Sequence, residues 1–305
     1  MNFMRLDCIE VSKIHDSRPD PQNIMEVIKK KEEIRRVAVD ARAAGETVGL
    51  VPTMGFFHEG HLQLMRRARS ECDVVVVSLF VNPTQFCAGE DLESYPRDFD
   101  RDGGLAEAEG VDYIFAPEVE EMYPEGSATF VEVERLSGVM CGRSRPEHFR
   151  GVATVVAKLF NIVPAQRAYF GQKDAQQLVI VKRMAADLDF GIEIVPVPTV
   201  REPDGLAMSS RNMYLLPEER EQAVALFRSL EEARRLIESG ERRPGAVLAA
   251  MQAVFYAYPL VNLEYISICD NIFLKPLEEL SGEVLVGVTV RLGRARLIDN
   301  MLFTT

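Results

Sequence analysis

The sequence predicts an open, mostly parallel α/β sheet followed by a smaller α+β domain. Through about residue 200, short unbroken apolar runs alternate with helical patterns, and such runs are typical of parallel strands covered on both faces. After Arg201 the alternation stops, and a long charged segment precedes three late apolar runs. The 305 residues suffice for about two domains, so we expect an N-terminal extension over 1–23, a main domain over 24–200 and a C-terminal domain over 201–305.

The main domain begins with a helical pattern over 24–44 that ends before Gly45. The β-branched run 47–53 predicts a buried strand, 61–70 a helix, and the apolar run 73–82 a second buried strand. Because this order is one βαβ unit, we expect its two strands to be parallel.

The same alternation continues along the chain. Further helices are expected over 98–109, 148–163 and 174–188, and further strands over 110–117, 168–171 and 192–197. In the C-terminal domain we expect helices over 217–238 and 246–256, strands over 263–269, 284–290 and 295–299, and a hairpin turn at 291–294. Open sheets of this class bind their ligands at the carboxyl ends of the parallel strands.

The composition narrows the possible partners and compartment. Lys plus Arg number 35 against 47 Asp plus Glu, and the resulting net charge of −12 disfavours binding to long nucleic acids. No apolar run approaches the roughly 20 residues of a membrane span, and the first residues lack the apolar core of a signal peptide. The five cysteines are odd in number and form no CxxC pair. We therefore expect a cytoplasmic protein with neither a nucleic-acid nor a membrane partner.

The clearest candidate site lies in the first turn between a strand and a helix. The chain has no G-x-G-x-x-G, P-loop, H-E-x-x-H or G-x-S-x-G motif, but MGFFHEGH follows the first buried strand. His58 and His61 are three residues apart, so in a helical turn both imidazoles would share a face. The helix start supplies free N–H groups, and Gly55 and Gly60 allow close approach of the backbone to a ligand. This pattern predicts a phosphate-binding site.

The histidine pair has two other possible roles. A zinc site needs about four ligands, and the remaining histidines, His15 and His148, have no obvious place beside the pair. We therefore expect no resident metal. A surface or capping role is the ordinary expectation for an isolated H-x-x-H, but the position at a strand-turn-helix junction favours a ligand site.

Several segments resemble one known family. PTMGFFHEGH is similar to the HxGH signature of the nucleotidylyltransferase superfamily, whose members are relatives of class I aminoacyl-tRNA synthetases. In their order, five further segments resemble the pantothenate synthetase (pantoate-β-alanine ligase) family: FVNPTQF (80–86), DLESYPR (91–97), HFRGVATVVAKLFNIV (148–163), GQKDAQQ (171–177) and VPTVREPDGLAMSSRN (197–212). The resemblance covers about residues 24–300 and implies a Rossmann-like parallel sheet.

The resemblance also implies an activity. The family condenses (R)-pantoate with β-alanine to pantothenate, in coenzyme A biosynthesis, through a pantoyl adenylate that forms from ATP with release of pyrophosphate and AMP. By this resemblance we expect ATP and the two acids as ligands, Mg²⁺ carried with the ATP phosphates, and a homodimer.

Residue roles follow from the same motifs. The resemblance implies His61 as the main catalytic donor, together with His58, Lys173 and Arg211. It implies ATP contacts by Met54, Gly55, His58, Gly60, His61, Gly171, Gln172, Lys173, Asp174, Val200, Met208, Ser209, Ser210 and Arg211. Met54 and Val200 would act mainly through their main chain, and Ser209 to Arg211 would act as a lid or clamp on the phosphates. Gln85 and Gln177 match the positions that hold pantoate or β-alanine, where an amide can both donate and accept hydrogen bonds.

Some alternatives stay open at this point. Asp174 is either a helix cap or a nucleotide contact, and Lys173 alone would ordinarily be a solvated lysine. Departures from the family pattern occur at Phe56-Phe57, Glu147, Gln172 and Ala175. The competing functions are a nucleotidylyltransferase for another acid and a catalytically silent binding protein, and the intact phosphate-contacting residues argue against the latter.

Overall fold

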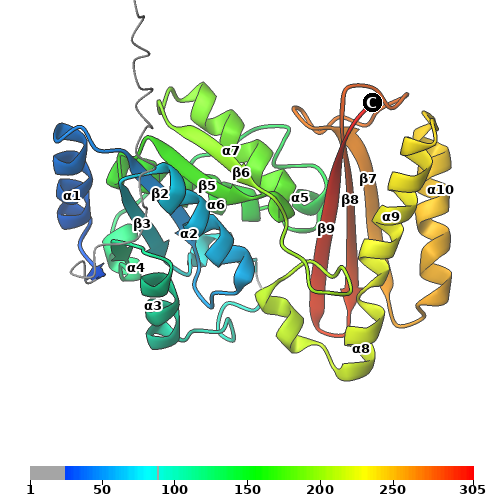
Figure 1. Ribbon diagram of the computed structural model, residues 1–305, viewed down its shortest axis with the longest axis horizontal. Helices are drawn as coiled ribbons and strands as arrows, with labels where there is room; N and C mark the ends of the chain where they lie inside the picture. Colours follow the sequence, from blue (N-terminus) through cyan, green and yellow to red (C-terminus); the bar gives the residue numbers. More distant parts are fainter. Residues whose placement is uncertain (1–24, 88) are drawn as a thin grey trace, which may run out of the picture.

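The computed structural model describes residues 25–87 and 89–305. The expected extension over 1–23 lies outside the described residues. Within them the chain forms a six-stranded parallel sheet and a three-stranded antiparallel sheet, which lie in two neighbouring lobes (Figure 1). The fold class predicted from the sequence is thereby confirmed.

The parallel sheet has the strand order β1-β4-β3-β2-β5-β6. Its strands are β1 (Glu26–Ile28), β2 (Val48–Thr53), β3 (Val74–Leu79), β4 (Tyr113–Phe115), β5 (Arg167–Gly171) and β6 (Glu193–Val197). The chain runs from β2 to one side through β3 and β4, and then returns to place β5 and β6 on the other side of β2. The direction of winding therefore reverses between β2 and β5, and ligands bind at such a switch point, beyond the carboxyl ends of the strands.

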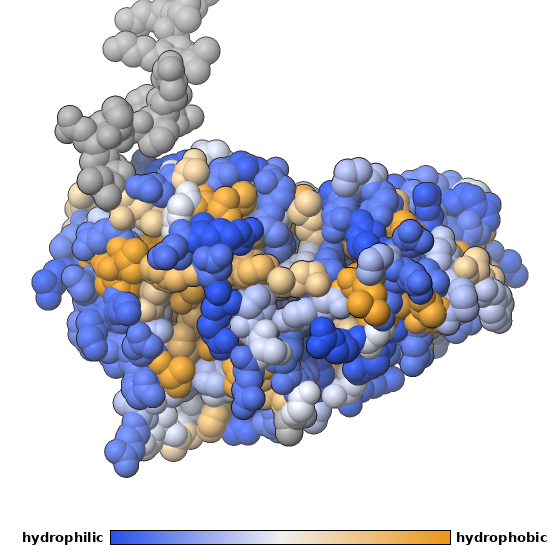
Figure 2. All heavy atoms as spheres, turned by 90° about the horizontal axis from the view of Figure 1, so that it is seen from below, coloured by the Kyte–Doolittle hydropathy of each residue, from blue (hydrophilic) through white to orange (hydrophobic). Residues whose placement is uncertain are grey.

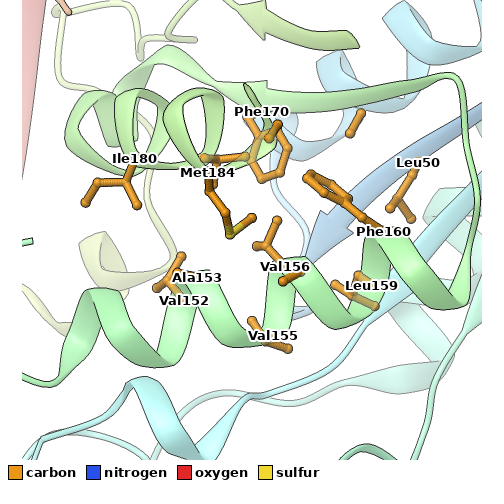
Figure 3. Close-up of a cluster of buried hydrophobic side chains, with 14 of the residues drawn as sticks. Leu50, Val152, Ala153, Val155, Val156, Leu159, Phe160, Phe170, Ile180 and Met184 are labelled. Carbon is orange, nitrogen blue, oxygen red and sulfur yellow. The ribbon is translucent and has the colours of Figure 1, made fainter. Parts of the chain in front are cut away.

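Helices cover both faces of this sheet, which explains its unbroken apolar strands. On one face α1 (Lys31–Ala43), α6 (His148–Ile162) and α7 (Ala175–Asp187) share a core with Leu50. On the other face α2 (Glu59–Glu71) and α3 (Phe99–Ala108) pack with Val51. Neighbouring residues of a strand point to opposite faces, so each strand serves both cores. Figure 3 shows Val156 and Phe160 of α6 in the first core, near Leu50 and Met184.

The second sheet has a core of its own. Its strands are β7 (Asn262–Asp270), β8 (Glu283–Leu292) and β9 (Ala295–Thr304), covered by α9 (Ala225–Glu238) and α10 (Pro244–Val254). Leu226 and Leu230 of α9 pack with Val286 and Val288 of β8, all nearly fully buried. The predicted hairpin between the last two strands is confirmed, since Leu292 pairs with Ala295.

Short helices complete the described part. They are α4 (Val119–Met122), α5 (Cys141–Ser144) and α8 (Pro217–Gln222), with the 3₁₀ turns η1 (Pro83–Gln85), η2 (Gln172–Asp174), η3 (Ser210–Tyr214) and η4 (Phe255–Ala257). No helix among the described residues is long and apolar enough to cross a membrane. On the face shown in Figure 2, hydrophobic residues form separate patches among hydrophilic ones.

Two sequence-based assignments were wrong. The helix expected over 24–44 begins at Lys31, because residues 26–28 pair with β4 as the edge strand β1. The helix expected over 217–238 is divided into α8 and α9. At the division Leu226 N–H bonds to the Ala223 carbonyl three residues back, and the fully buried Ala223 anchors the turn in the second core.

Candidate active site

A cavity of about 980 Å³ lies where the carboxyl ends of the parallel strands meet the second sheet. This volume suits a small-molecule site, for which roughly 300–1,000 Å³ is typical. Most of the predicted site residues line it: Met54, His58, Gly60, His61, Gln85, Gly171, Lys173, Asp174, Gln177, Val200, Met208, Ser209, Ser210 and Arg211. Gly55 and Gln172 are not among the lining residues.

The histidine pair lies at the start of α2, directly after β2. His58 is the residue that caps the helix, and its Nδ1 accepts a hydrogen bond from the Gly60 N–H at 3.1 Å. Nδ1 of His61 accepts one from the His58 N–H at 3.2 Å. The ring centroids are 4.1 Å apart. The two rings therefore lie side by side as expected, although His58 caps the helix instead of lying within its first turn.

These hydrogen bonds determine where each imidazole carries its proton. A ring nitrogen that accepts a hydrogen bond bears no hydrogen, so each neutral ring carries its proton on Nε2. Burial, and then the charge of Lys173, lowers the pKa of His58 from 6.5 to about 4. Burial, and then His58, lowers the pKa of His61 well below 6.5. At pH 7 both rings are thus neutral, and each keeps an Nε2–H donor that its helix-capping bond does not use.

Glycine at position 60 allows the His58 ring to lie over the helix start. A Cβ at this position would lie 2.8 Å from Cε1 and 2.9 Å from Nδ1 of His58. A Cβ atom essentially never approaches another atom this closely, so any larger residue would displace the ring.

The turn before His58 contacts α3 through its backbone amides. Gly55 (φ +85°) and Phe56 (φ +53°) are both left-handed. The N–H groups of Phe56 and Phe57 donate to the Asp102 carboxylate at 2.5 and 2.7 Å. These two amides are therefore engaged within the protein, and Gly55 shapes the turn instead of lining the cavity.

Lys173 and Asp174 lie in η2, directly after β5. The ammonium of Lys173 has no hydrogen-bond or ion-pair partner among residues 25–87 and 89–305, and the side chain lines the cavity. Asp174 precedes α7 but makes no capping hydrogen bond with its side chain. Of the two interpretations of Asp174, the geometry favours contact with a ligand over helix capping.

The second sheet holds two segments that line the cavity. Nδ2 of the buried Asn300, in β9, donates to the carbonyl oxygens of Gln172 at 3.0 Å and Lys173 at 2.8 Å. Nε2 of Gln172 returns a bond to Asn300 Oδ1 at 3.2 Å, so this side chain is occupied by the protein. The neighbouring Asp299 accepts two bonds from Arg201, at 2.6 and 3.0 Å. Consecutive residues of β9 thus fix the turn of Lys173 and the start of the 201–212 segment.

Arg211 is paired within the protein. Its Nε and Nη2 donate to the two Asp91 oxygens at 3.2 and 3.1 Å. The Ser209 hydroxyl accepts the Arg211 N–H at 3.3 Å and thereby caps η3. The Ser210 side chain, in the first turn of η3, interacts with the buried Tyr95 of this loop. The segment 209–211 therefore lies against the 91–95 loop, at the edge of the cavity.

Gln85 is fixed beside the end of β2. Its Oε1 accepts a hydrogen bond from Nδ2 of the buried Asn82 at 3.2 Å, and its Nε2 lies 2.9 Å from Met54 Sδ. Asn82 also bonds to the Gly151 carbonyl in α6 at 3.1 Å, which ties this loop to the main core. Gln177 reaches the same cavity from the first turn of α7.

Sequence reasoning missed several residues of this cavity, among them His148 and Arg145. Nδ1 of His148 lies 2.7 Å from the Gln85 carbonyl and must carry the proton, because a carbonyl only accepts. Burial, and then Arg145, lowers the pKa of His148 to about 4. Arg145 pairs with Glu90. No local signal marks this contact, which joins residues 63 positions apart.

The charges around the cavity differ from those of the whole chain. Six cationic side chains line it, namely Arg145, Lys173, Arg211, Arg291, Arg294 and Arg296, against the four carboxylates Glu90, Asp91, Asp174 and Asp299. The chain as a whole carries −12. The cationic excess is therefore local, as a pocket for an anionic ligand requires.

This fold, with neutral imidazole donors and a lysine ammonium at its switch point, defines an α/β enzyme with an anion-binding active site. The family model described as pantoate-β-alanine ligase matches residues 26–302. The chain belongs to the pantoate-β-alanine ligase family.

Individual relatives agree with this membership. The pantothenate synthetase of Heliobacterium modesticaldum is 59% identical over 258 residues, which cover 85% of this chain and 92% of that one. The crystal structure of pantothenate synthetase from Thermus thermophilus matches with a TM-score of 0.86 at 49% identity, over 91% of this chain and 99% of that one. The pantoate-β-alanine ligase of Francisella tularensis, complexed with β-γ ATP and β-alanine, matches with a TM-score of 0.73 at 30% identity, over 92% and 98% of the two chains.

Proposed function

We propose that the protein condenses (R)-pantoate with β-alanine to pantothenate in this cavity, in a reaction driven by ATP. A pantoate carboxylate oxygen attacks the α-phosphorus of ATP, which gives pantoyl adenylate and pyrophosphate. The β-alanine amine then attacks the acyl carbon, the amide bond forms and AMP leaves. Family membership supports the overall reaction, and the complex of the Francisella relative supports ATP and β-alanine as ligands.

The observation that carries the phosphate assignment is the pair of Nε2–H donors on His58 and His61. They share a cavity with the Lys173 ammonium, which has no partner within the described part of the chain. Adenylation builds negative charge on the α-phosphate and on the departing pyrophosphate, and donors fixed in advance stabilise that charge. His61 is the principal catalytic donor in this proposal. His58 and Lys173 contact the neighbouring phosphates, and Ser209 and Ser210 approach them from the other side.

Two residues keep internal bonds that bear on the proposal. Arg211 forms an ion pair with Asp91. To contact the phosphates, the Arg211 guanidinium must first leave the Asp91 carboxylate. Gln85 and Gln177 supply amides for the pantoate hydroxyl and carboxylate groups. The fixed Gln85, held by Asn82, supports a preformed acid-binding end of the cavity.

Magnesium enters this proposal with ATP. No group of three or more His, Cys, Asp or Glu side chains among the described residues could hold a metal. Mg²⁺ bound to a nucleotide needs only one or two carboxylates beside the phosphates and its waters, and Asp174, without a capping bond, is the residue that fits this role. When bound, the ion would neutralise charge on the phosphate oxygens.

The remaining proposals concern organisation. We assign residues 24–200 to nucleotide and pantoate binding and residues 201–305 to a smaller domain that closes the site, because Leu206 already belongs to the second core. We propose that the protein is a cytoplasmic homodimer. Sedimentation velocity of the purified protein tests the dimeric state.

Exchange of labelled pyrophosphate into ATP, with Mg²⁺ and without β-alanine, tests the first half-reaction. Exchange that requires pantoate is the expected result, since only a reversible adenylate links the two pools. Exchange that occurs with a different acid and not with pantoate would identify another nucleotidylyltransferase. A protein that binds ATP without any exchange would be a silent homologue.

A further inference from the structure

Asp102 is a buried carboxylate that the proposed chemistry does not use. It lies in α3 with a side chain only 1% exposed, on the face that packs toward α2. Burial raises its pKa, while the amides of Phe57 and Phe56 and the charge of Arg101 oppose that rise. Burial of a carboxylate is costly, and this one accepts two short hydrogen bonds from backbone N–H groups. These bonds indicate that Asp102 stabilises the conformation of that backbone.

The backbone that Asp102 holds is a strained turn. Phe56 is left-handed at φ +53°, a conformation that a bulky side chain keeps only when its surroundings impose it. Its N–H and that of Phe57 point together into the kind of concavity that binds anions in other proteins. Here the two carboxylate oxygens fill it, at 2.5 and 2.7 Å.

A second group from α3 reinforces the same turn. Nη2 of Arg101 donates to the Phe57 carbonyl at 2.9 Å, and its guanidinium lies 5.1 Å from the centre of the Phe56 ring. The position of Gly55 is equally constrained, because a Cβ there would lie 3.1 Å from Asp102 Oδ2. The turn is therefore held from one side, by consecutive residues of one helix.

The turn leads directly into the histidine pair. Phe57 is fully buried, its ring lies 5.5 Å from that of His61, and the next residue is His58. A rotation of the Phe56 or Phe57 peptide would thus move the His58 N–H, which bonds to His61 Nδ1. Loss of that bond would release the ring that offers Nε2–H to the ligand.

We propose that Asp102 is a positioning residue for the reacting histidines: by occupying the anion concavity of the 55–57 turn, it fixes the direction of both Nε2–H donors. The role rests on the proposed function of the histidine pair. It also explains why the phosphates are met by imidazoles at this turn, since the backbone amides that could bind them are already occupied.

Asp102→Asn tests the proposal, with Asp100→Asn as the matched control. Asparagine is isosteric, but its Nδ2 would face a backbone N–H, so one of the two bonds becomes a repulsion. Asp100 is exposed on the same helix, and its replacement removes the same charge. We expect pantoate-dependent exchange in Asp102→Asn to fall about 10²-fold in rate, as for a displaced catalytic group, with a smaller change in KM for ATP.

The ring signals of the histidines report positioning independently of turnover. The chain has four histidines, so their ¹⁵N ring resonances are few enough to assign by replacement. In Asp102→Asn, the Nδ1 and Nε2 signals of His58 and His61 should shift while those of His148 stay. In Asp100→Asn, none should shift.

A double variant covers the case in which Asp102→Asn folds poorly. Glycine adopts a left-handed conformation without strain, so Phe56→Gly should restore part of the activity and of the ring signals in the Asp102→Asn background. A lower melting temperature with unchanged ring signals and unchanged turnover per folded molecule would overturn the positioning role. Absence of exchange in the unaltered protein would instead overturn the proposed function, and the ring signals would still decide the role of Asp102.

Discussion

Two imidazoles occupy the start of α2, where helices usually place serine, threonine, aspartate or asparagine. A carboxylate would satisfy the free amides equally well, but it would keep no hydrogen to donate to a ligand. Each histidine accepts a backbone N–H on one nitrogen and keeps a donor on the other. In the proposed site, the imidazole would thus transfer the hydrogen-bonding capacity of the helix start to a ligand, without adding a charge.

His61→Gln separates this donor from the helix cap. Glutamine at this position can still accept the N–H of the capping residue, as in a capping box, but it cannot place a hydrogen where Nε2–H was. We expect turnover to fall about 10²–10³-fold, with a melting temperature close to that of the unaltered protein. His61→Ala should lose both the Nε2–H donor and the hydrogen bond that caps the helix. Equal activity in His61→Gln and the unaltered protein would contradict the assigned donor.

The lowered pKa of His58 makes the stability of the protein depend on pH. The unfolded chain takes up this proton near pH 6.5, whereas the folded protein resists it until about pH 4. The free energy of unfolding should therefore fall between pH 6.5 and pH 4 and level off below, by roughly 3 kcal/mol for this residue. Urea unfolding at several pH values should give a shallower slope for His58→Gln. Parallel curves for the two proteins would refute the burial of a neutral ring.

At the scale of elements, the contact between Gly60 and His58 can be tested with a single methyl group. Gly60→Ala should leave α2 folded, because alanine favours helices. It should displace the His58 ring and thereby lower the rate of pantoate-dependent exchange of pyrophosphate into ATP. The matched control is Gly104→Ala in α3, where a Cβ would meet no atom within 4 Å. That variant should be more stable by about 0.5–1 kcal/mol with unchanged activity. Full activity in Gly60→Ala would contradict the close contact.

Local pattern determined most elements but not all their bounds. The apolar runs that became β2, β3 and β5 are long enough to be recognised alone. The strand β1 has three residues, and only its pairing with β4, far along the chain, makes it a strand. The short helices α4 and α5 lie in a stretch whose pattern has no period, so sequence reasoning assigned nothing there.

The same distinction holds for the site. His58, His61 and Lys173 follow buried strands, and the position of a residue after a strand can be read from the chain. The roles of Asp102 and Asn300 could not be predicted from the sequence, because each side chain binds backbone groups far away along the chain. Asp102 is 46 residues from Phe56, and Asn300 is 127 residues from Lys173. Their residue types are common, and only the folded structure gives them partners.

At the scale of the whole molecule, Asn300 joins the two sheets at the cavity. Asn300→Ala would leave the carbonyl groups of Gln172 and Lys173 without these donors. We expect KM for ATP to rise about tenfold, the equivalent of roughly 1.4 kcal/mol for the lost bonds. Asn262→Ala, at the exposed start of β7, is the control and should leave KM unchanged. An unchanged KM for ATP in Asn300→Ala would show that the conformation of the Lys173 turn does not depend on Asn300.

The bond from Asn300 to the Lys173 turn also has a consequence for synthesis of the protein. The ribosome adds Asn300 127 residues after Lys173, an interval of about 6–25 s at ordinary elongation rates. During this time a nascent chain can fold its parallel sheet and already carry the histidine pair. The lysine turn gains its last hydrogen bonds only when β9 has emerged. An unfinished chain would thus meet cellular ATP with an incomplete site, and reactive acyl adenylates would form more readily on molecules that have both sheets in place.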